Sequence, residues 1–199
     1  NDVAILQNSH SVATGASEKF LAFENNDLPG IYGAGAVQTL MNVHGVLPGE
    51  KVVMIGSGNI GLIVSYQLLQ AGVKVLKVLE AGPSIGGYKV HASKLKRLGV
   101  DILTKHSIKK AIGTNKLEKI IVSKLDDSWN YVDGSDFEIE TDALCISVGL
   151  SPMGNLLSML GAEMKYISKL GGMVPVIDHN HETTISNVFV AGDVCGVEE

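Results

Sequence analysis

Three glycines at fixed intervals, Gly56, Gly58 and Gly61, stand between an apolar stretch and a helical pattern. At a strand–helix junction the first such glycine permits a tight turn, and the second lets the backbone approach a diphosphate. The third allows the helix to pack closely on the strand. The unpaired amides and the positive end of the helix then attract phosphate oxygens. The spacing therefore predicts a dinucleotide site whose turn consists of Gly56, Ser57, Gly58, Asn59, Ile60 and Gly61.

Glu80 follows this turn by about twenty residues, at the end of the next apolar run. A carboxylate at that position accepts hydrogen bonds from the hydroxyls of an adenine ribose and repels a 2′-phosphate. Residues Ala81 to Tyr88 contain no Arg or Lys that would hold such a phosphate. We therefore predict NAD as the cofactor, with NADP as the less favoured alternative; the other alternative is that Glu80 is only a polar strand end.

The apolar pattern predicts the elements that hold the turn in place. Residues 52–55 read as a buried strand, 60–71 as a helix and 73–79 as a second buried strand, which together have the size of a βαβ unit. Outside this unit the pattern predicts strands at 3–6, 100–104, 119–125, 137–141, 143–148 and 188–191, helices at 36–43, 88–98 and 151–160, and a polar loop before the last strand. We expect an α/β fold: a parallel sheet with helices on both faces and a β-meander.

The composition narrows the class of protein. The chain has 199 residues, of which 45% are hydrophobic and only 5% aromatic, and its formal net charge is −5. That balance fits a folded core and argues against nucleic acid or an anionic membrane as a partner. The two cysteines, Cys145 and Cys195, form no CxxC pair, so a reducing, cytoplasmic setting is expected. Because the first residue is Asn, we expect a piece of a longer protein.

The remaining polar residues suggest no catalytic group and no metal site. Cys145 lies in a buried strand, and no base is identifiable near either cysteine. The run from Asp178 to Glu182 contains two histidines but reads as a solvated loop. Nine of the sixteen basic residues lie between Lys89 and Lys119. We interpret that region as a solvated face, with attraction of an anionic cofactor or an acidic partner protein as the alternative.

Further motifs resemble a known family, the two-dinucleotide-binding-domain flavoproteins of the FAD- and NAD(P)-dependent pyridine nucleotide–disulphide oxidoreductase superfamily. Residues 13–16 (Ala-Thr-Gly-Ala) are similar to its ATG segment, and residues 184–193, which end in Ala-Gly-Asp, to its second flavin motif. Residues 146–149, followed by Pro152, resemble its strand end beside the nicotinamide domain. The resemblance implies flavin contacts at Thr14, Gly15, Gly192 and Asp193, and a nicotinamide-side contact at Gly149.

In this family an NAD domain is inserted into an FAD domain. The resemblance therefore implies that residues 1–30 are a remnant of the FAD-binding domain, 31–160 the NAD(P)-binding domain, and 161–199 the return into the FAD-binding domain. The flavin domain's own glycine turn and the redox-active CxxC of some members have no counterpart here. We expect no disulphide reduction by a local dithiol and no FAD binding by this chain alone.

A finer resemblance concerns residues 28–40 and 196–199. These are similar to the α-subunit group of sarcosine oxidases, dye-linked proline dehydrogenases and cyanide-forming glycine dehydrogenases. This resemblance implies hydride transfer between NAD(P)H and a flavin, and oxidation of a small-molecule amine or imino acid in an intact complex. Two alternatives stay open: an electron-transfer reductase that docks a small acceptor protein, and a non-catalytic subunit with a regulatory nucleotide site.

Overall fold

The computed structural model describes residues 9–197 and divides the chain into two compact units. The larger unit is the continuous stretch Phe20–Val148, and the smaller unit comprises the described residues up to Lys19 and from Gly149 onward. One unit is thus inserted into the other. These boundaries differ from positions 30 and 160, where the family resemblance placed them; the expected strand at 3–6 lies outside the described residues.

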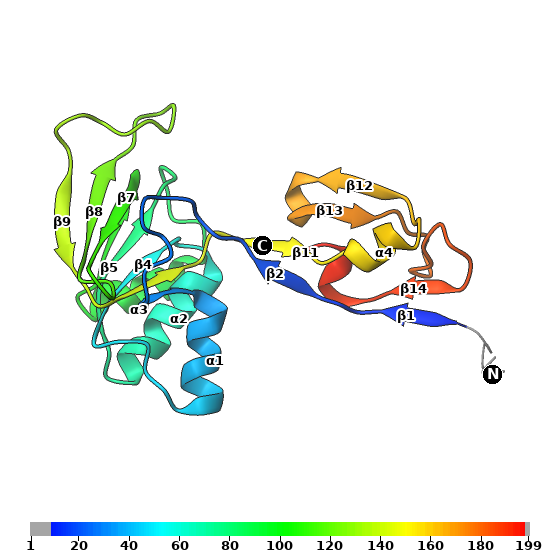
Figure 1. The fold of residues 1–199 in the computed structure, drawn as a ribbon, viewed down its shortest axis with the longest axis horizontal. Helices are drawn as coiled ribbons and strands as arrows, with labels where there is room; N and C mark the ends of the chain where they lie inside the picture. The colour runs from blue at the N-terminus through cyan, green and yellow to red at the C-terminus, as the bar shows by residue number, and fades with distance from the viewer. Residues whose placement is uncertain (1–8, 198–199) are drawn as a thin grey trace. The chain divides into compact units, whose positions relative to one another are not determined.

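A five-stranded parallel sheet forms the centre of the larger unit (Figure 1). Its spatial order is β3 (Ile31–Gly33), β10 (Ala143–Ile146), β4 (Lys51–Ile55), β5 (Lys74–Glu80) and β6 (Asp101–Thr104). The middle strand, β4, is buried from Val52 to Ile55, as its unbroken apolar run predicts. Because β4 is central, the turn at its carboxyl end lies between the ends of β10 and β5.

Three helices cover one face of this sheet. They are α1 (Ala34–His44), α2 (Asn59–Gln70) and α3 (Lys89–Arg97). Val37 of α1, Leu68 of α2 and Leu95 of α3 are fully buried in one cluster with Met54 of β4. The predicted βαβ unit, β4–α2–β5, is confirmed within one or two residues at each boundary.

The opposite face of the sheet is covered by an antiparallel meander. Its strands are β7 (His106–Ile112), β8 (Lys119–Lys124) and β9 (Phe137–Glu140). Ile108 and Ile120 from the meander are buried against Val53 and Leu144 of the sheet. The expectation of helices on both faces was therefore wrong, because the meander buries the second apolar face instead.

Strand β7 was not predicted from the sequence. A register shift between Ile108 and Lys110 interrupts its pairing with β8, and the two-residue alternation of buried and exposed side chains breaks there. Such an irregularity removes the period by which a strand is recognised. The meander consequently has three strands where the sequence predicted two.

The smaller unit consists of short strands around one short helix. Strand β1 (His10–Val12) pairs in parallel with β14 (Val188–Val190), and β2 (Ala16–Glu18) pairs antiparallel with β11 (Leu150–Pro152). A hairpin joins β12 (Met164–Ile167) and β13 (Gly172–Pro175) through the 3-10 turn η1 (Ser168–Leu170). The helix is α4 (Asn155–Met159), and a second 3-10 turn, η2 (Gly192–Cys195), follows β14. A small core of five buried residues holds the unit together: Leu157, Ala162, Val188, Val190 and Val194.

Two expectations for this part of the chain are corrected. Residues 151 and 152 belong to strand β11 rather than to a helix, because they pair with Ser17 and Ala16 of β2. The expected polar loop contains the β12–β13 hairpin. Gly171 and Gly172 have φ angles of +85° and +146° there, so the hairpin depends on a backbone conformation that only glycine adopts readily.

Candidate nucleotide site at the glycine turn

Gly56 begins the turn and accounts for its shape. Its φ angle is +97°, and a Cβ at this position would overlap the carbonyl oxygen of Ser147. The amide of Gly56 donates to the carbonyl of Leu79 at 2.8 Å, which ties the end of β4 to the end of β5. Only glycine combines this positive φ angle with such close backbone contact. The role predicted for the first glycine agrees with its surroundings.

Gly58 and Gly61 have opposite surroundings. A Cβ at Gly61 would overlap the carbonyl oxygen of Gly56 and come within 3.3 Å of Cβ of Ser147, so this position is packed. A Cβ at Gly58 would have no heavy atom within 4 Å. The turn is therefore packed against the protein at Gly61 and leaves free space at the Cβ position of Gly58. Close approach of a diphosphate requires this arrangement.

The start of helix α2 supplies donors at this open position. Gly58 is the N-cap, and its carbonyl accepts the first backbone bond of the helix from Leu62 at 3.1 Å. The amides of Asn59, Ile60 and Gly61 precede that bond and have no acceptor within the helix. Together with the positive helix end, they form an electrostatic environment that favours an anion.

The carboxylate of Glu80 is bonded to the glycine turn. One oxygen, Oε2, accepts both the Ser57 amide at 3.0 Å and the Ser57 hydroxyl at 2.5 Å. The other, Oε1, accepts the Gly82 amide at 2.7 Å. Glu80 is thus placed beside the turn, as its position at the end of β5 predicts. The sequence did not predict that three donors of the protein itself would occupy it.

Residues 82–88, which we call the strap, lie against the same turn. The Gly86 amide donates to the Ser57 hydroxyl at 3.1 Å, and the Gly87 amide donates to the Ser57 carbonyl at 2.8 Å. A Cβ at Gly87 would lie 2.8 Å from the Asn59 amide nitrogen, so only glycine fits there. The strap was not predicted from the sequence, although its paired glycines are a signal for close backbone contact.

The flavin-side residues named in the sequence analysis belong to the smaller unit. The Thr14 hydroxyl donates to the Met153 carbonyl at 2.7 Å, and the Gly15 carbonyl accepts the Met153 amide at 2.9 Å. Gly192 has a φ angle of +81° with open space at its Cβ position, and Asp193 is exposed. These positions therefore offer open backbone and a carboxylate. Gly149, which also lies in this unit, has a φ angle of +106°.

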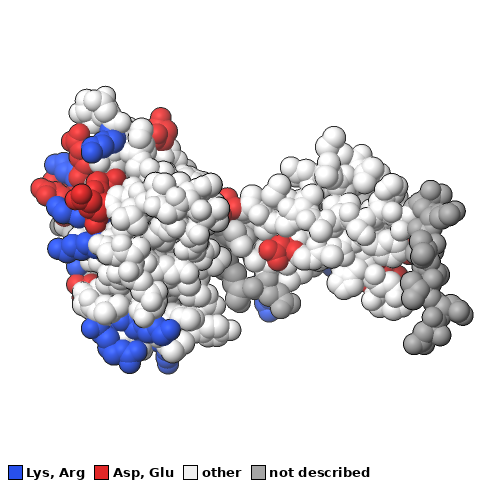
Figure 2. Space-filling view, turned by 90° about the horizontal axis from the view of Figure 1, so that it is seen from below, with Lys and Arg blue, Asp and Glu red and all other residues white. Residues whose placement is uncertain are grey.

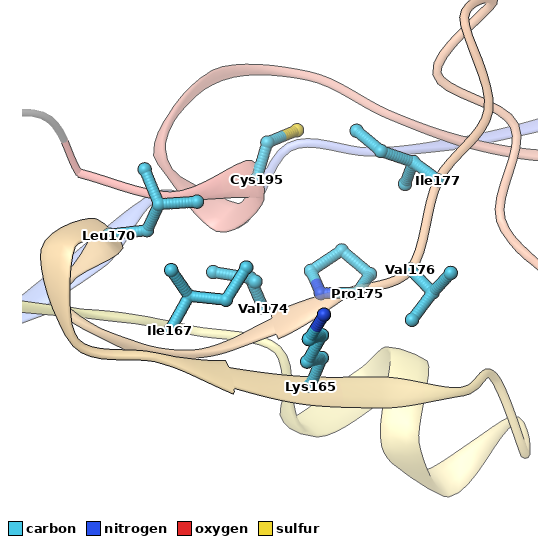
Figure 3. A pocket seen from close by; sticks show the side chains of 8 residues that line it. All are labelled: Lys165, Ile167, Leu170, Val174, Pro175, Val176, Ile177 and Cys195. Carbon is cyan, nitrogen blue, oxygen red and sulfur yellow. The ribbon is translucent and has the colours of Figure 1, made fainter.

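A pocket of about 270 Å³ lies in the smaller unit (Figure 3). Its lining is largely aliphatic and comes from β12, η1, β13 and η2, with one ammonium group and one thiol. The lining residues are Lys165, Ile167, Leu170, Val174, Pro175, Val176, Ile177 and Cys195. This surface can take an apolar group but has no carboxylate or imidazole for acid–base chemistry. No sequence motif indicates this pocket, because two of its sides come from the unpredicted β12–β13 hairpin.

The thiols offer little nucleophilic chemistry. Cys145 is fully buried in β10, as expected. Burial, and secondarily the charge of Asp193, raise the pKa of the Cys195 thiol, which therefore stays protonated at neutral pH. At the run from Asp178 to Glu182, the Asp178 carboxylate accepts the amides of Asn180 and Glu182, which closes an exposed loop. Within residues 9–197, no group of His, Cys, Asp and Glu side chains is arranged to hold a metal ion.

The basic region separates into two parts. In the meander part, Lys105, Lys109 and Lys119 form ion pairs with Asp127, Asp136 and Glu138 at 2.6 to 2.8 Å. Helix α3 carries the other concentration of positive charge, at Lys89, Lys94, Lys96 and Arg97. Figure 2 shows a face of the larger unit on which blue and red side chains alternate and one blue group stands apart. Only the helical part keeps an excess of charge that could attract an anionic partner.

The chain is similar to known proteins of one family. The family model described as pyridine nucleotide-disulphide oxidoreductase matches residues 8–199. An opine oxidase subunit from Agrobacterium tumefaciens (strain Ach5) is 29% identical over 200 residues, covering 96% of this chain and 40% of the relative. The alpha subunit of sarcosine oxidase from Corynebacterium sp. (strain U-96) is 28% identical over 188 residues, covering 94% of this chain and 18% of the relative. The chain thus spans less than half the length of both relatives.

Among solved structures, the thioredoxin reductase of T. acidophilum superposes with a TM-score of 0.75 at 22% identity. The superposition covers 94% of this chain and 58% of that chain. At this identity the likeness concerns the fold, which is a Rossmann-like α/β architecture. Among the described residues, no helix has the length and apolar character needed to cross a membrane.

Proposed function

Because the chain belongs to the pyridine nucleotide-disulphide oxidoreductase family, we propose that it is part of a flavin-dependent oxidoreductase whose larger unit binds NAD. The observation that carries this proposal is the glycine turn at the centre of the parallel sheet. Gly58 is open there, the first amides of α2 have no acceptor within the helix, and Glu80 lies beside the turn. A carboxylate next to a diphosphate-binding turn favours a ribose with a free 2′-hydroxyl.

Each residue of the turn has a distinct part in binding. The amides of Asn59, Ile60 and Gly61 donate to diphosphate oxygens, and the missing side chain of Gly58 lets the ligand approach them. The Glu80 carboxylate accepts hydrogen bonds from the ribose hydroxyls and excludes a 2′-phosphate by charge repulsion. A bound nicotinamide supplies the hydride chemistry, so the chain's own residues bind and orient rather than act as acid, base or nucleophile.

The smaller unit supplies flavin contacts in this proposal. Gly192 has open space where a side chain would stand, and Asp193 has an exposed carboxylate. Thr14 and Gly15 form the segment that is hydrogen-bonded to Met153. Gly149 lies on the nicotinamide side. The 199 residues contain only one complete glycine turn, in the larger unit, so we propose that this chain alone does not retain FAD. Stoichiometric flavin absorbance on the purified chain would contradict that.

The substrate proposal comes from the relatives. Two of them are named as subunits of opine oxidase and sarcosine oxidase. By this likeness, the intact protein oxidises a small amine or imino acid, and a partner subunit takes part. A cytoplasmic location belongs to the same proposal, because neither Cys145 nor Cys195 forms a disulphide.

Titration of NADH and NADPH against the chain tests the nucleotide site. NADH should bind more tightly than NADPH, and Glu80→Ala should weaken NADH binding by about tenfold or more, as loss of hydrogen bonds to a charged group predicts. Asp101→Ala is a control, since that exposed carboxylate on β6 pairs with Lys77 rather than with the turn. A preference for NADPH in the unmodified chain would overturn the NAD assignment.

A second candidate is a non-catalytic subunit with a regulatory nucleotide site. It is favoured by the subunit names of the relatives and by the three protein donors already bonded to Glu80. A third is an electron-transfer reductase that docks an acidic acceptor protein on α3. Flavin reduction by NADH in the assembled protein separates the first two candidates, because a regulatory site gives none. Salt-dependent binding of an acidic acceptor protein would favour the third.

A further inference from the structure

The hydrogen bonds of Glu80 leave it few acceptor positions. Each carboxylate oxygen has two lone pairs, so the whole group accepts about four hydrogen bonds. Oε2 already accepts two, from the amide and the hydroxyl of Ser57, and Oε1 accepts one from Gly82. A ribose diol donates two hydrogen bonds, and only one position is left for them. At least one of the present donors has to leave before Glu80 can hold both hydroxyls.

The Ser57 hydroxyl is the donor best able to leave. The amides of Ser57 and Gly82 are fixed by the backbone, whereas a hydroxyl hydrogen rotates about its C–O bond. The same oxygen accepts the Gly86 amide at 3.1 Å, so it also helps to hold the strap against the turn. The strap is in turn bonded to the start of α2, where the Tyr88 amide donates to Oδ1 of Asn59 at 2.8 Å. One buried hydroxyl therefore connects Glu80, the strap and the start of α2.

We propose that Ser57 is an internal competitor for Glu80 and thereby sets the affinity and selectivity of the site for a nucleotide with a free ribose diol. Its hydroxyl occupies the acceptor position that one ribose hydroxyl needs, and it keeps the strap closed. Binding exchanges the Ser57 hydroxyl for a ribose hydroxyl on Oε2. The inference rests on the proposed nucleotide site and specifies a positioning residue within it.

The variant Ser57→Ala removes the competitor with little damage to the fold. Glu80 keeps the amides of Ser57 and Gly82, because the substitution does not alter the backbone. Gly86 is exposed, so its amide can donate to water once the hydroxyl is gone. No buried donor is left without an acceptor. A change in nucleotide affinity can therefore be read as an effect on the site.

NADH and NADPH titrations of this variant test the inference. Ser57→Ala should bind NADH about three- to tenfold more tightly, the range that the net contribution of one hydrogen bond allows. The gain should be smaller for NADPH, which lacks the 2′-hydroxyl. Combined with Glu80→Gln, the same substitution should give no gain, since its effect passes through the carboxylate. An unchanged or weaker NADH affinity in Ser57→Ala would refute the competition, because a competitor's removal can only tighten binding.

Ser65→Ala is the matched control. Ser65, which lies on α2, is fully buried like Ser57, but its hydroxyl donates to the Gly61 carbonyl of its own helix at 2.7 Å. Ser65→Ala should leave the affinities for NADH and NADPH unchanged.

Amide hydrogen exchange separates failure of this inference from failure of the proposed function. Gly87 donates to the Ser57 carbonyl and Lys105 to the Gly82 carbonyl, so neither amide bonds the Ser57 side chain. Both should exchange faster in Ser57→Ala than in Ser65→Ala, because the strap opens more often. If the unmodified chain binds neither nucleotide, the proposed function fails while faster exchange still supports the closed strap. Unchanged exchange at both amides would refute that part of the inference.

Discussion

Gly58 and Gly61 lie in one turn but differ in what surrounds them, which makes them a matched pair for substitution. Gly58→Ala puts a methyl group into open space at an ordinary negative φ angle of −64°. It should change the free energy of unfolding by no more than about 1 kcal/mol, the cost of a poorer N-cap. It should weaken NADH binding on the order of tenfold, because the methyl group stands where the diphosphate approaches.

Gly61→Ala should show the reverse pattern. Its methyl group would overlap the Gly56 carbonyl, so the variant should lose about 2 kcal/mol or more of stability, as overpacked sites do. Urea titration measures the stability of both variants, and NADH titration measures their binding. Equal loss of stability in the two variants would show that the open position at Gly58 does not exist.

Residue types and spacing predicted where the three glycines and Glu80 lie in the fold, because a tight strand–helix turn and the end of the next strand depend on the local sequence. The donors on Glu80 were not predictable in the same way. Ser57 and Gly82 reach the carboxylate only because β4 and β5 are adjacent in the folded sheet. The protein donors that occupy Glu80 therefore become apparent only in the folded structure.

Among the elements, the meander carries an ion pair that includes a carboxyl group with a lowered pKa. Lys109 forms an ion pair with Asp136 at 2.8 Å. A hydrogen bond from Lys109, and then one from Ser123, lower the pKa of the Asp136 carboxyl from its ordinary 3.8, against the opposing effect of burial. A lowered pKa stabilises the fold above the ordinary value, and this contribution is lost as the pH falls through the folded-state pKa.

The stability difference between the unmodified chain and Asp136→Asn should therefore shrink as the pH falls from about 5 to about 2. Thermal unfolding across this pH range measures it. Lys109→Met supplies the control, because without the lysine the asparagine substitution should have a smaller effect at every pH. A difference that stays constant across the range would argue against the ion pair.

The elements that the sequence predicted best are those with an uninterrupted period. Strand β4 and helix α2 belong to this group, and both agree with the structure within one or two residues. Strand β7 has a register shift, and β12 and β13 carry exposed side chains at Lys165 and Met173. The apolar pattern of these three strands is therefore not regular enough to be recognised. Short, irregular strands take their shape from their pairing partners rather than from local periodicity.

For the whole molecule, the two units should differ in stability. The larger unit has clusters of fifteen and nine buried residues on the two faces of its sheet, whereas the cluster in the smaller unit has five. A smaller core supplies less hydrophobic stabilisation. We expect the smaller unit to lose amide protection at a lower urea concentration than the larger one.

The amides of Val190 and Leu144 can report on the two units. Val190 donates to the His181 carbonyl in the smaller unit, and Leu144 donates to the Gly30 carbonyl in the larger. Hydrogen exchange at increasing urea should release Val190 first. Simultaneous release would mean that the chain unfolds as one cooperative body.

The stretch Phe20–Val148 forms one continuous unit, whereas the family resemblance implied an NAD(P)-binding domain over residues 31–160. The positions of its ends were less predictable. Residues 20–30 are rich in turn formers and show no period, while residues 150–152 form a strand by pairing with β2. Where one unit stops and another starts depends on such pairings, which connect residues far apart in the sequence.

The crossing points of the insertion have one more consequence. The Lys19 amide donates to the Gly149 carbonyl at 2.9 Å, so the chain leaves the smaller unit and re-enters it at adjoining places. A module whose two ends adjoin can be cut out and replaced by a short linker, or exchanged for a different module, without stretching its host. The inserted unit Phe20–Val148 is therefore suited to deletion or replacement by protein engineering.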